Sequence, residues 1–232
     1  TINGKSCTLD DESLDLVGIK HGDIEELVKL LPSLSKLRTV ELGAEETKDA
    51  SIEWEDIAQL VAAAPEADFN YSFTLYDKKF NLNDTEMDIN HIKIYDNGEL
   101  VRRILPCMSG LSYLDMDFCG VSNEDMAAIR DEFPNVKVVW RVWFGDNYSV
   151  RTDVEKILAS RPVPGGALDD SDMEILKYCT DVKYLDIGHN PLITDLSFTK
   201  CMPNLEVAIL AMNGCTDISA LAECPHLEFL EI

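Results

Sequence analysis

One six-residue phrase, with apolar residues at its first, fourth and sixth positions, recurs along the whole sequence. Its copies occupy residues 37–42, 111–116, 182–187, 205–210 and 227–232. The alternation of apolar and polar residues in the second half of each copy predicts a short strand with one buried face. A unit of this size cannot bury its apolar face alone, so neighbouring copies must stack on one another. The repeat therefore favours an array of stacked, strand-containing coils.

The last three copies are regularly spaced. They begin at residues 182, 205 and 227, a period of 22 to 23 residues, which lies within the roughly 20 to 29 residues of leucine-rich repeats. Two copies continue to Asn190 and Asn213, and another reaches Cys119. A buried Asn there can satisfy the turning backbone of neighbouring coils. In these features the chain from about residue 170 onward resembles bacterial, internalin-like leucine-rich-repeat proteins. The resemblance implies a solenoid fold and a binding role, and it brings no catalytic residue.

A longer unit of about 70 residues repeats upstream of this region. The segment 31–42 matches 105–116 and then 176–187, and no linker interrupts the series. We therefore predict a single domain, 1–232: an α/β leucine-rich-repeat solenoid with a curved, mostly parallel sheet on its concave side and helices or irregular turns on its convex side. Its expected parts are long units at about 5–78, 79–146 and 147–213, and a terminal repeat at 214–232.

Helices are expected between the strand phrases. Ser122 with Asp125 and Ser171 with Glu174 have the form of capping boxes, in which side chains satisfy the first free amides of a helix. The predicted helices cover 23–31, 51–64, 122–133 and 171–178.

Two longer alternating stretches, 69–76 and 138–144, are each followed by a polar turn. This pattern predicts β-hairpins that distort the regular coil.

The charge narrows the choice of partner. Asp and Glu number 43 against 20 Lys and Arg, a net charge of −23. Nucleic acid is excluded as a partner because its binding depends on clustered Lys and Arg. No run approaches the ~18 apolar residues of a membrane span, so no membrane insertion is expected. A basic partner is compatible with this charge, and so is an acidic surface that serves only solubility.

The residues with nucleophilic, acid–base or metal-binding side chains form no recognised catalytic or metal-binding motif. The four histidines lack a metal-ligand spacing, and no nucleophile motif or phosphate-binding loop is present. The seven cysteines are odd in number and loosely spaced, so we expect mostly reduced thiols packed as small apolar groups. We therefore expect no enzyme and no cofactor.

The strand positions that point away from the core remain as a candidate site. The third and fifth positions of the phrase repeatedly place an aromatic residue beside an acid. Aromatic residues supply contact area in interfaces, although they also favour strands for structural reasons. We expect these acids to stand on coils separated by at least one other strand, ~10 Å apart or more, too far to share a metal ion. The predicted partner-binding residues are Tyr113, Asp115, Tyr184, Asp186, Phe229 and Glu231.

The sequence thus predicts a non-catalytic module that binds a protein or a glycan on its concave face. Two alternatives stay open: a hydrolase that uses carboxylates on the same face, and a structural spacer in a longer surface protein. Thr1 falls where the next long unit has a hairpin turn, and Ile232 ends on a core position. We therefore expect the chain to belong to a longer polypeptide, secreted or at the cell surface, with a cytoplasmic location left open.

Overall fold

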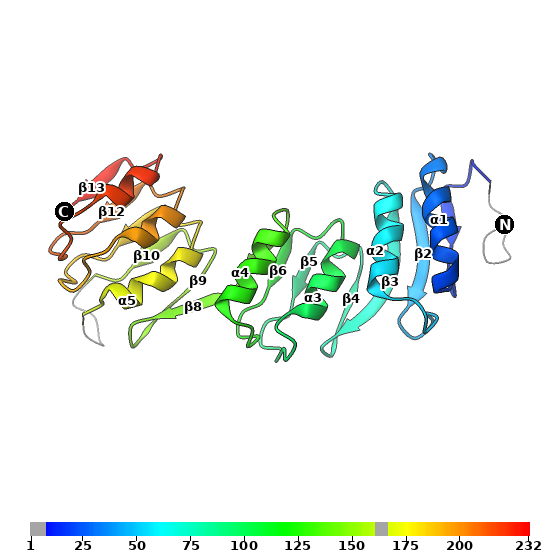
Figure 1. The fold of residues 1–232 in the computed structure, drawn as a ribbon, viewed down its shortest axis with the longest axis horizontal. Helices are drawn as coiled ribbons and strands as arrows, with labels where there is room; N and C mark the ends of the chain where they lie inside the picture. Colours follow the sequence, from blue (N-terminus) through cyan, green and yellow to red (C-terminus); the bar gives the residue numbers. More distant parts are fainter. Residues whose placement is uncertain (1–7, 161–166) are drawn as a thin grey trace. The chain divides into compact units, whose positions relative to one another are not determined.

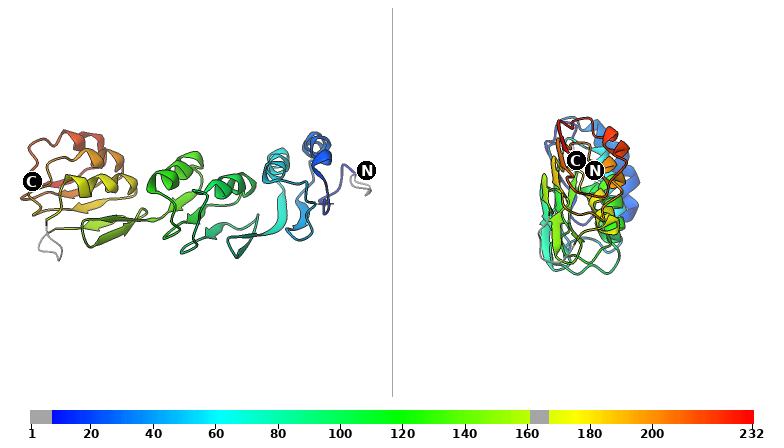
Figure 2. Two further views of the ribbon diagram at one scale, coloured as in Figure 1. Left: turned by 60° about the horizontal axis from the view of Figure 1, so that its bottom comes forward. Right: turned by 90° about the vertical axis from the view of Figure 1, so that its left-hand side faces the viewer.

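The computed structural model describes residues 8–160 and 167–232. The chain divides into two compact units, Thr1–Val138 and Val139–Ile232, called here the N-terminal and C-terminal units. In each unit, taken by itself, the helices gather on one face of the strands (Figures 1 and 2). Each unit thus has the layered strand-and-helix arrangement that stacked coils require.

The N-terminal unit alternates strands and helices along the chain. Its strands are β1 (Ser13–Asp15), β2 (Thr39–Ala44), β3 (Asp68–Leu75), β4 (Lys78–Asn81), β5 (Glu86–Asp88), β6 (Tyr113–Asp115) and β7 (Lys137–Val139). Its α-helices are α1 (Ile24–Leu30), α2 (Trp54–Ala63), α3 (Glu99–Ile104) and α4 (Asn123–Glu132). Short 3₁₀ turns cover His21–Asp23, Leu31–Ser33 and Leu105–Cys107. The strands form two sheets, ordered β1-β2-β3-β4 and β5-β6-β7.

The C-terminal unit begins with a hairpin and continues as a regular parallel ladder. The hairpin pairs β8 (Arg141–Phe144) with β9 (Tyr148–Arg151). The ladder runs β10 (Lys156–Leu158), β11 (Tyr184–Asp186), β12 (Val207–Ile209) and β13 (Phe229–Glu231). Between these strands lie α5 (Asp170–Met173) and 3₁₀ turns at Glu174–Tyr178, Ser197–Cys201 and Ser219–Glu223.

The register of the ladder places the apolar centre of each strand phrase in the core. Ile157, Leu185 and Ala208 are successive partners, and each is at most 1% exposed. Full burial of a Leu or Ile side chain contributes about 1.5–3 kcal/mol. The apolar positions of the repeat therefore specify both the strand face and the stacking of coils.

Asn190 ties neighbouring coils together, as the sequence predicts. Its side-chain amide donates to the carbonyl oxygens of Ala159 (3.0 Å), Ile187 (2.8 Å) and Gly188 (3.1 Å). Its side-chain oxygen accepts the backbone N–H of Leu168 at 3.0 Å. The side chain is thus fully used in satisfying a buried turn.

The predicted helices are present, with one change in how they start. Ser122 caps α4 by accepting the backbone N–H of Asp125 at 3.0 Å. The cap of α5, however, is Asp169, whose carboxylate accepts the N–H groups of Ser171 (2.9 Å) and Asp172 (3.3 Å). The capping box proposed for Ser171 is wrong because an ionised carboxylate two residues earlier already satisfies these amides.

Both predicted hairpins are confirmed, and the first explains why the expected single sheet is wrong. Strand β3 pairs antiparallel with β4 through a turn at Tyr76 and Asp77, which have φ values of 48° and 69°. The edge of β3 that would accept the next parallel strand is therefore occupied by β4. Strand β5 starts a separate sheet, so the described residues form four sheets. The continuity of the whole chain as one solenoid stays a prediction.

Candidate functional site

The strands of the C-terminal unit present one face away from the core, called here the C-terminal strand face. The register aligns its side chains in two rows that cross the four strands. The first row is Lys156, Tyr184, Val207 and Phe229, and the second is Leu158, Asp186, Ile209 and Glu231. The residues between them on β10, β11 and β12 are buried, so the two rows form the accessible side of the sheet.

The C-terminal strand face is mostly apolar and partly exposed. Leu158 is 57% exposed and Phe229 51% exposed. The Lys156 ammonium lies 4.3 Å from the ring centroid of Tyr184. Asp186 accepts a hydrogen bond from the Ser160 hydroxyl at 3.2 Å. This combination of apolar area and a few fixed charges is typical of interface surfaces.

The structure brings together four of the six residues that the sequence proposes. Tyr184, Asp186, Phe229 and Glu231 all lie on the C-terminal strand face. Tyr113 and Asp115 lie on β6 of the N-terminal unit. The sequence analysis missed Leu158, whose position after Ile157 in the ladder is the signal that could have indicated it.

In the N-terminal unit, acids occupy directly paired positions on adjacent strands. Asp15 is the register partner of Glu41, and Asp88 is the partner of Asp115. Neighbouring strands lie only ~4.8 Å apart, so the two acids of each pair stand side by side. The expectation of acids separated by another strand concerned the full phrases, and it holds for Asp186 on β11 and Glu231 on β13, between which β12 lies. The sequence analysis did not consider Asp15 and Asp88, because the short strands β1 and β5 lack the full apolar phrase.

The recurring acid also has a structural role at the strand end. The carboxylates of Asp15, Asp88 and Asp115 each accept the backbone N–H two residues later, at 3.0, 2.9 and 2.9 Å. Asp186 does the same with Gly188 at 3.2 Å. This side-chain turn satisfies an amide where the chain leaves the sheet. The turn explains why Asp recurs at this position, and it uses one carboxylate oxygen of each residue.

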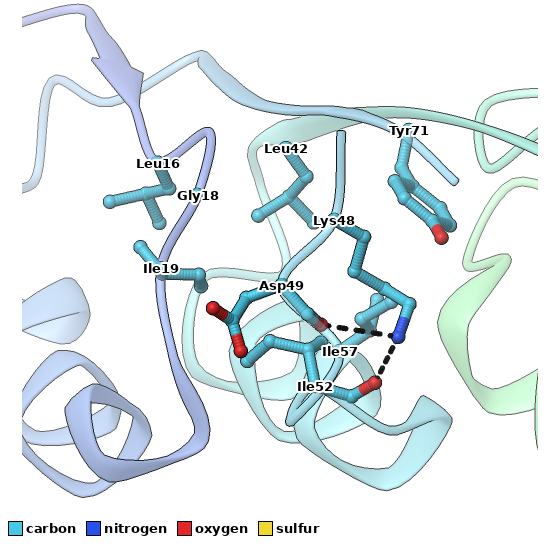
Figure 3. Close-up of a pocket in the computed structure, with 9 residues that line it drawn as sticks. All are labelled: Leu16, Gly18, Ile19, Leu42, Lys48, Asp49, Ile52, Ile57 and Tyr71. Carbon is cyan, nitrogen blue, oxygen red and sulfur yellow. Dashed lines mark hydrogen bonds between the residues drawn. The ribbon is translucent and has the colours of Figure 1, made fainter. Parts of the chain in front are cut away.

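A small pocket in the N-terminal unit is lined mostly by core side chains (Figure 3). Its volume of 10 Å³ is room for about one water molecule. Lys48 donates its ammonium hydrogens to the carbonyl oxygens of Asp49 and Ile52 at this cavity. Burial, followed by the charges of Glu45 and Glu46, raises the pKa of Tyr71 to about 12. These groups are held in fixed structural contacts and leave no space for a substrate.

Two open grooves have volumes of 420 and 460 Å³, one in each unit. In the larger groove, Asp170 accepts hydrogen bonds from the backbone of Thr194 (2.6 Å) and Asp195 (2.9 Å). Asp195 in turn accepts the N–H and the hydroxyl of Ser197 at 2.8 and 2.6 Å. These carboxylates act as acceptors that tie coils and cap a 3₁₀ turn.

A His–Asp contact in the N-terminal unit also has a structural geometry. The Nδ1 atom of His21 lies 3.0 Å from both carboxylate oxygens of the buried Asp56. This hydrogen bond, together with the charge of Asp56, raises the pKa of His21. The nearby Ser51 hydroxyl accepts the backbone N–H of His21 and donates to Asp49. The Ser51 hydroxyl thus contacts the backbone of His21 and not its ring, so Ser51, His21 and Asp56 lack the connectivity of a nucleophilic triad.

Within residues 8–160 and 167–232, no group of three or more His, Cys, Asp or Glu side chains is arranged to hold a metal ion. The six cysteines in this part of the chain form no disulfide bond. Cys107 and Cys179 are buried as expected, but Cys201 is exposed. Among the described helices, none is long and apolar enough to cross a membrane.

No family model matches this sequence, and no curated protein matches it. Among solved structures, internalin C2 from Listeria monocytogenes aligns with a TM-score of 0.25 and 16% identity, over 87% of this chain and 67% of that chain. A second internalin from the same species has a TM-score of 0.23 and 15% identity, over 87% and 49%. A leucine-rich-repeat protein from Leptospira interrogans has a TM-score of 0.22 and 13% identity, over 86% and 50%. Internalins and a leucine-rich-repeat protein are thus among the solved structures with which this chain aligns.

Proposed function

We propose that this chain is a non-catalytic recognition module that binds a protein through the C-terminal strand face. The observation that carries the proposal is the alignment of partly exposed apolar and aromatic side chains across four parallel strands. A rigid sheet presents such side chains at little entropic cost, because the strands are already ordered before binding.

The rows also suggest how a partner would be anchored. Tyr184 and Phe229 stand at either side of Val207 in one row, so a partner can cover a continuous apolar strip. Aromatic anchors near the centre of an interface carry a large share of the binding energy. Asp186 and Glu231, in the second row, favour a partner with basic residues at the edge of its apolar patch.

The test uses binders selected from a protein library against the whole chain. The double variant Tyr184→Ala, Phe229→Ala should weaken them by about fivefold or more per anchor, which corresponds to ~1 kcal/mol. It should retain the far-ultraviolet circular dichroism spectrum and melting temperature within a few degrees, because partly exposed substitutions cost little stability.

Tyr95, which is 86% exposed in the N-terminal unit, offers a matched control. Tyr95→Ala removes a similar aromatic area but leaves the C-terminal strand face intact. Binders that are lost with Tyr95→Ala and kept with the double variant would place recognition elsewhere and contradict the proposal.

A further inference from the structure

The C-terminal strand face carries opposite charges at two opposite corners. Lys156 begins β10 and Glu231 ends β13, and these are the outer strands of the ladder (Figure 1). Both residues are exposed, and neither forms an ion pair within the described part of the chain. Three strand spacings of ~4.8 Å and two residues of ~3.3 Å along a strand place the two corners ~16 Å apart.

The β10 corner presents an exposed ammonium whose acidic neighbours already have partners. The Lys156 ammonium lies 4.3 Å from the ring centroid of Tyr184. Glu155, the residue before Lys156, is paired with Lys183 at 2.8 Å. Both carboxylate oxygens of Asp186 accept hydrogen bonds within the C-terminal unit, so this acid is fixed in place. Lys156 is therefore the charge at this corner that an acidic group of a partner can meet.

The β13 corner is acidic. Glu231 shares it with Glu228, which directly precedes β13, and Glu206 directly precedes the neighbouring strand β12. All three residues are exposed and form no ion pair with another described residue. Across the ladder, the face therefore changes from an exposed ammonium to a group of carboxylates. Such a change favours one direction of a charged partner over the other.

The apolar strip between the two corners favours a helix as the occupant. Its side chains offer a single hydroxyl group for hydrogen bonding, and they are Leu158, Tyr184, Val207, Ile209 and Phe229. An extended segment buried on this strip would leave backbone amide and carbonyl groups unsatisfied, which costs free energy. A helix satisfies these groups internally, and its diameter of ~10–12 Å covers both rows of the face, which lie ~6.6 Å apart.

We propose that the C-terminal strand face binds an amphipathic helix of a partner protein, laid across the strands with an acidic residue at Lys156 and a basic residue at Glu231. This inference rests on the proposed function of the face and names the chemistry of its partner. At a rise of 1.5 Å per residue, ~16 Å corresponds to about eleven residues, and residues eleven apart lie on one side of a helix. An acid is favoured near the N-terminus of a helix and a base near its C-terminus, so the N-terminus of the partner helix lies over β10.

The probes are two peptides of the same composition, each held helical by a covalent cross-link on its outer side. Both carry the same apolar stripe. The forward peptide has Glu near its N-terminus and Arg about eleven residues later, and the exchanged peptide has these two residues swapped. The forward peptide should bind the whole chain about fivefold more tightly or better, because the swap turns two attractive contacts into repulsive ones. Raising the salt concentration should reduce this ratio.

Exchanging the corner charges should invert the preference. In the double variant Lys156→Glu, Glu231→Lys, the exchanged peptide should bind more tightly than the forward peptide by a similar factor, although the net charge of the chain is unchanged. The matched control is Lys200→Glu, Glu223→Lys, which makes the same exchange at exposed residues of two 3₁₀ turns outside the sheet. It should leave the preference for the forward peptide as it is in the wild-type chain.

Equal affinity of the two peptides for the wild-type chain would overturn the proposal, and so would an unchanged preference in the variant with exchanged corners. Equal or tighter binding of a forward peptide with a central Pro and no cross-link would assign the face to an extended segment. Self-association of the chain that is lost in Tyr184→Ala, Phe229→Ala would assign the face to a second copy; either result overturns the helix.

The failure of this inference can be distinguished from the failure of the proposed function. If neither peptide binds while selected binders still depend on Tyr184 and Phe229, the helix is wrong and the proposed function stands. If selected binders do not depend on these two residues, the function proposed for the face is wrong, and the helix with it.

Discussion

At the residue scale, single polar side chains decide whether a coil closes. Asn190 is 1% exposed and makes four side-chain hydrogen bonds to turning backbone. Asn213, one repeat later, accepts the backbone N–H of Asn190 at 3.1 Å, but its buried side-chain nitrogen has no hydrogen-bond partner. Asn190 and Asn213, at the same repeat position, therefore make unequal numbers of side-chain hydrogen bonds to the backbone of the coils.

Replacing Asn190 by Ala should destabilise the chain strongly. The change leaves three carbonyl oxygens and one N–H group without their partners, and a buried polar group left unsatisfied costs about 1–3 kcal/mol. We expect a loss of ~3 kcal/mol or more in the free energy of unfolding, measured by urea denaturation. Asn213→Ala is the control and should cost ~1 kcal/mol. Equal losses in the two variants would show that the hydrogen bonds of Asn190 do not determine its contribution.

At the element scale, helices of successive coils are joined by an ion pair. Arg103 on α3 contacts both carboxylate oxygens of Glu55 on α2, at 2.7 and 2.9 Å, and Glu53 at 3.2 Å. Hydrogen bonding to Arg103, then a backbone hydrogen bond, lowers the pKa of Glu55 to about 2. The bidentate geometry requires a guanidinium, because an ammonium cannot present two parallel N–H groups.

The ion pair predicts a specific dependence on pH. A lowered pKa in the folded state means that Glu55 contributes stability above its ordinary pKa of 4.5, and that this contribution is lost as the pH falls through about 2. In Arg103→Ala the pKa of Glu55, followed by nuclear magnetic resonance of its side-chain carbonyl carbon, should return toward the ordinary value. Glu53→Gln, which keeps the Arg103–Glu55 contact, should change it much less. An unchanged pKa in Arg103→Ala would rule out the ion pair as the cause.

At the scale of the whole molecule, the sequence repeats and the contacts between residues divide the chain differently. Sequence repeats continue without a linker from one end to the other, whereas contacts divide the chain at Val138. In stacked repeats, stability is shared between neighbouring coils through their interfaces. The cooperativity of unfolding therefore tests whether the chain behaves as one solenoid.

We propose that the chain behaves as one solenoid of residues 1–232 and unfolds in a single transition. Calorimetric and van't Hoff enthalpies should then agree. In Asn190→Ala, the fluorescence of Trp54 in the N-terminal unit should change at the same lowered temperature as that of Trp140 in the C-terminal unit, each followed with the other tryptophans replaced by Phe. Two separate transitions, with only the Trp140 signal shifted, would refute the single solenoid.

The sequence by itself determined the features that depend on local pattern and nearest-neighbour stacking. The spacing of apolar residues indicated the buried centre of each strand, Asn190 was placed correctly at a buried turn, and both hairpins were found from alternation followed by a polar turn. These features could be predicted because each depends on residues close together in the chain or one repeat apart. The side of β11 and β13 that faces away from the core follows from the same alternation, so Tyr184 and Phe229 could be placed on that face from the sequence.

The tertiary structure alone decided which strand edges and polar groups are already occupied. Strand β4 fills the edge of β3 and splits the sheet, Asp169 rather than Ser171 caps α5, and Asp88 stands directly beside Asp115. The stack of His91 on Phe118 also joins residues of adjacent coils whose backbone conformation no pattern of residue types indicates. Each of these outcomes depends on a competition between groups for one partner or one space, and that competition is resolved only when the coils are packed together.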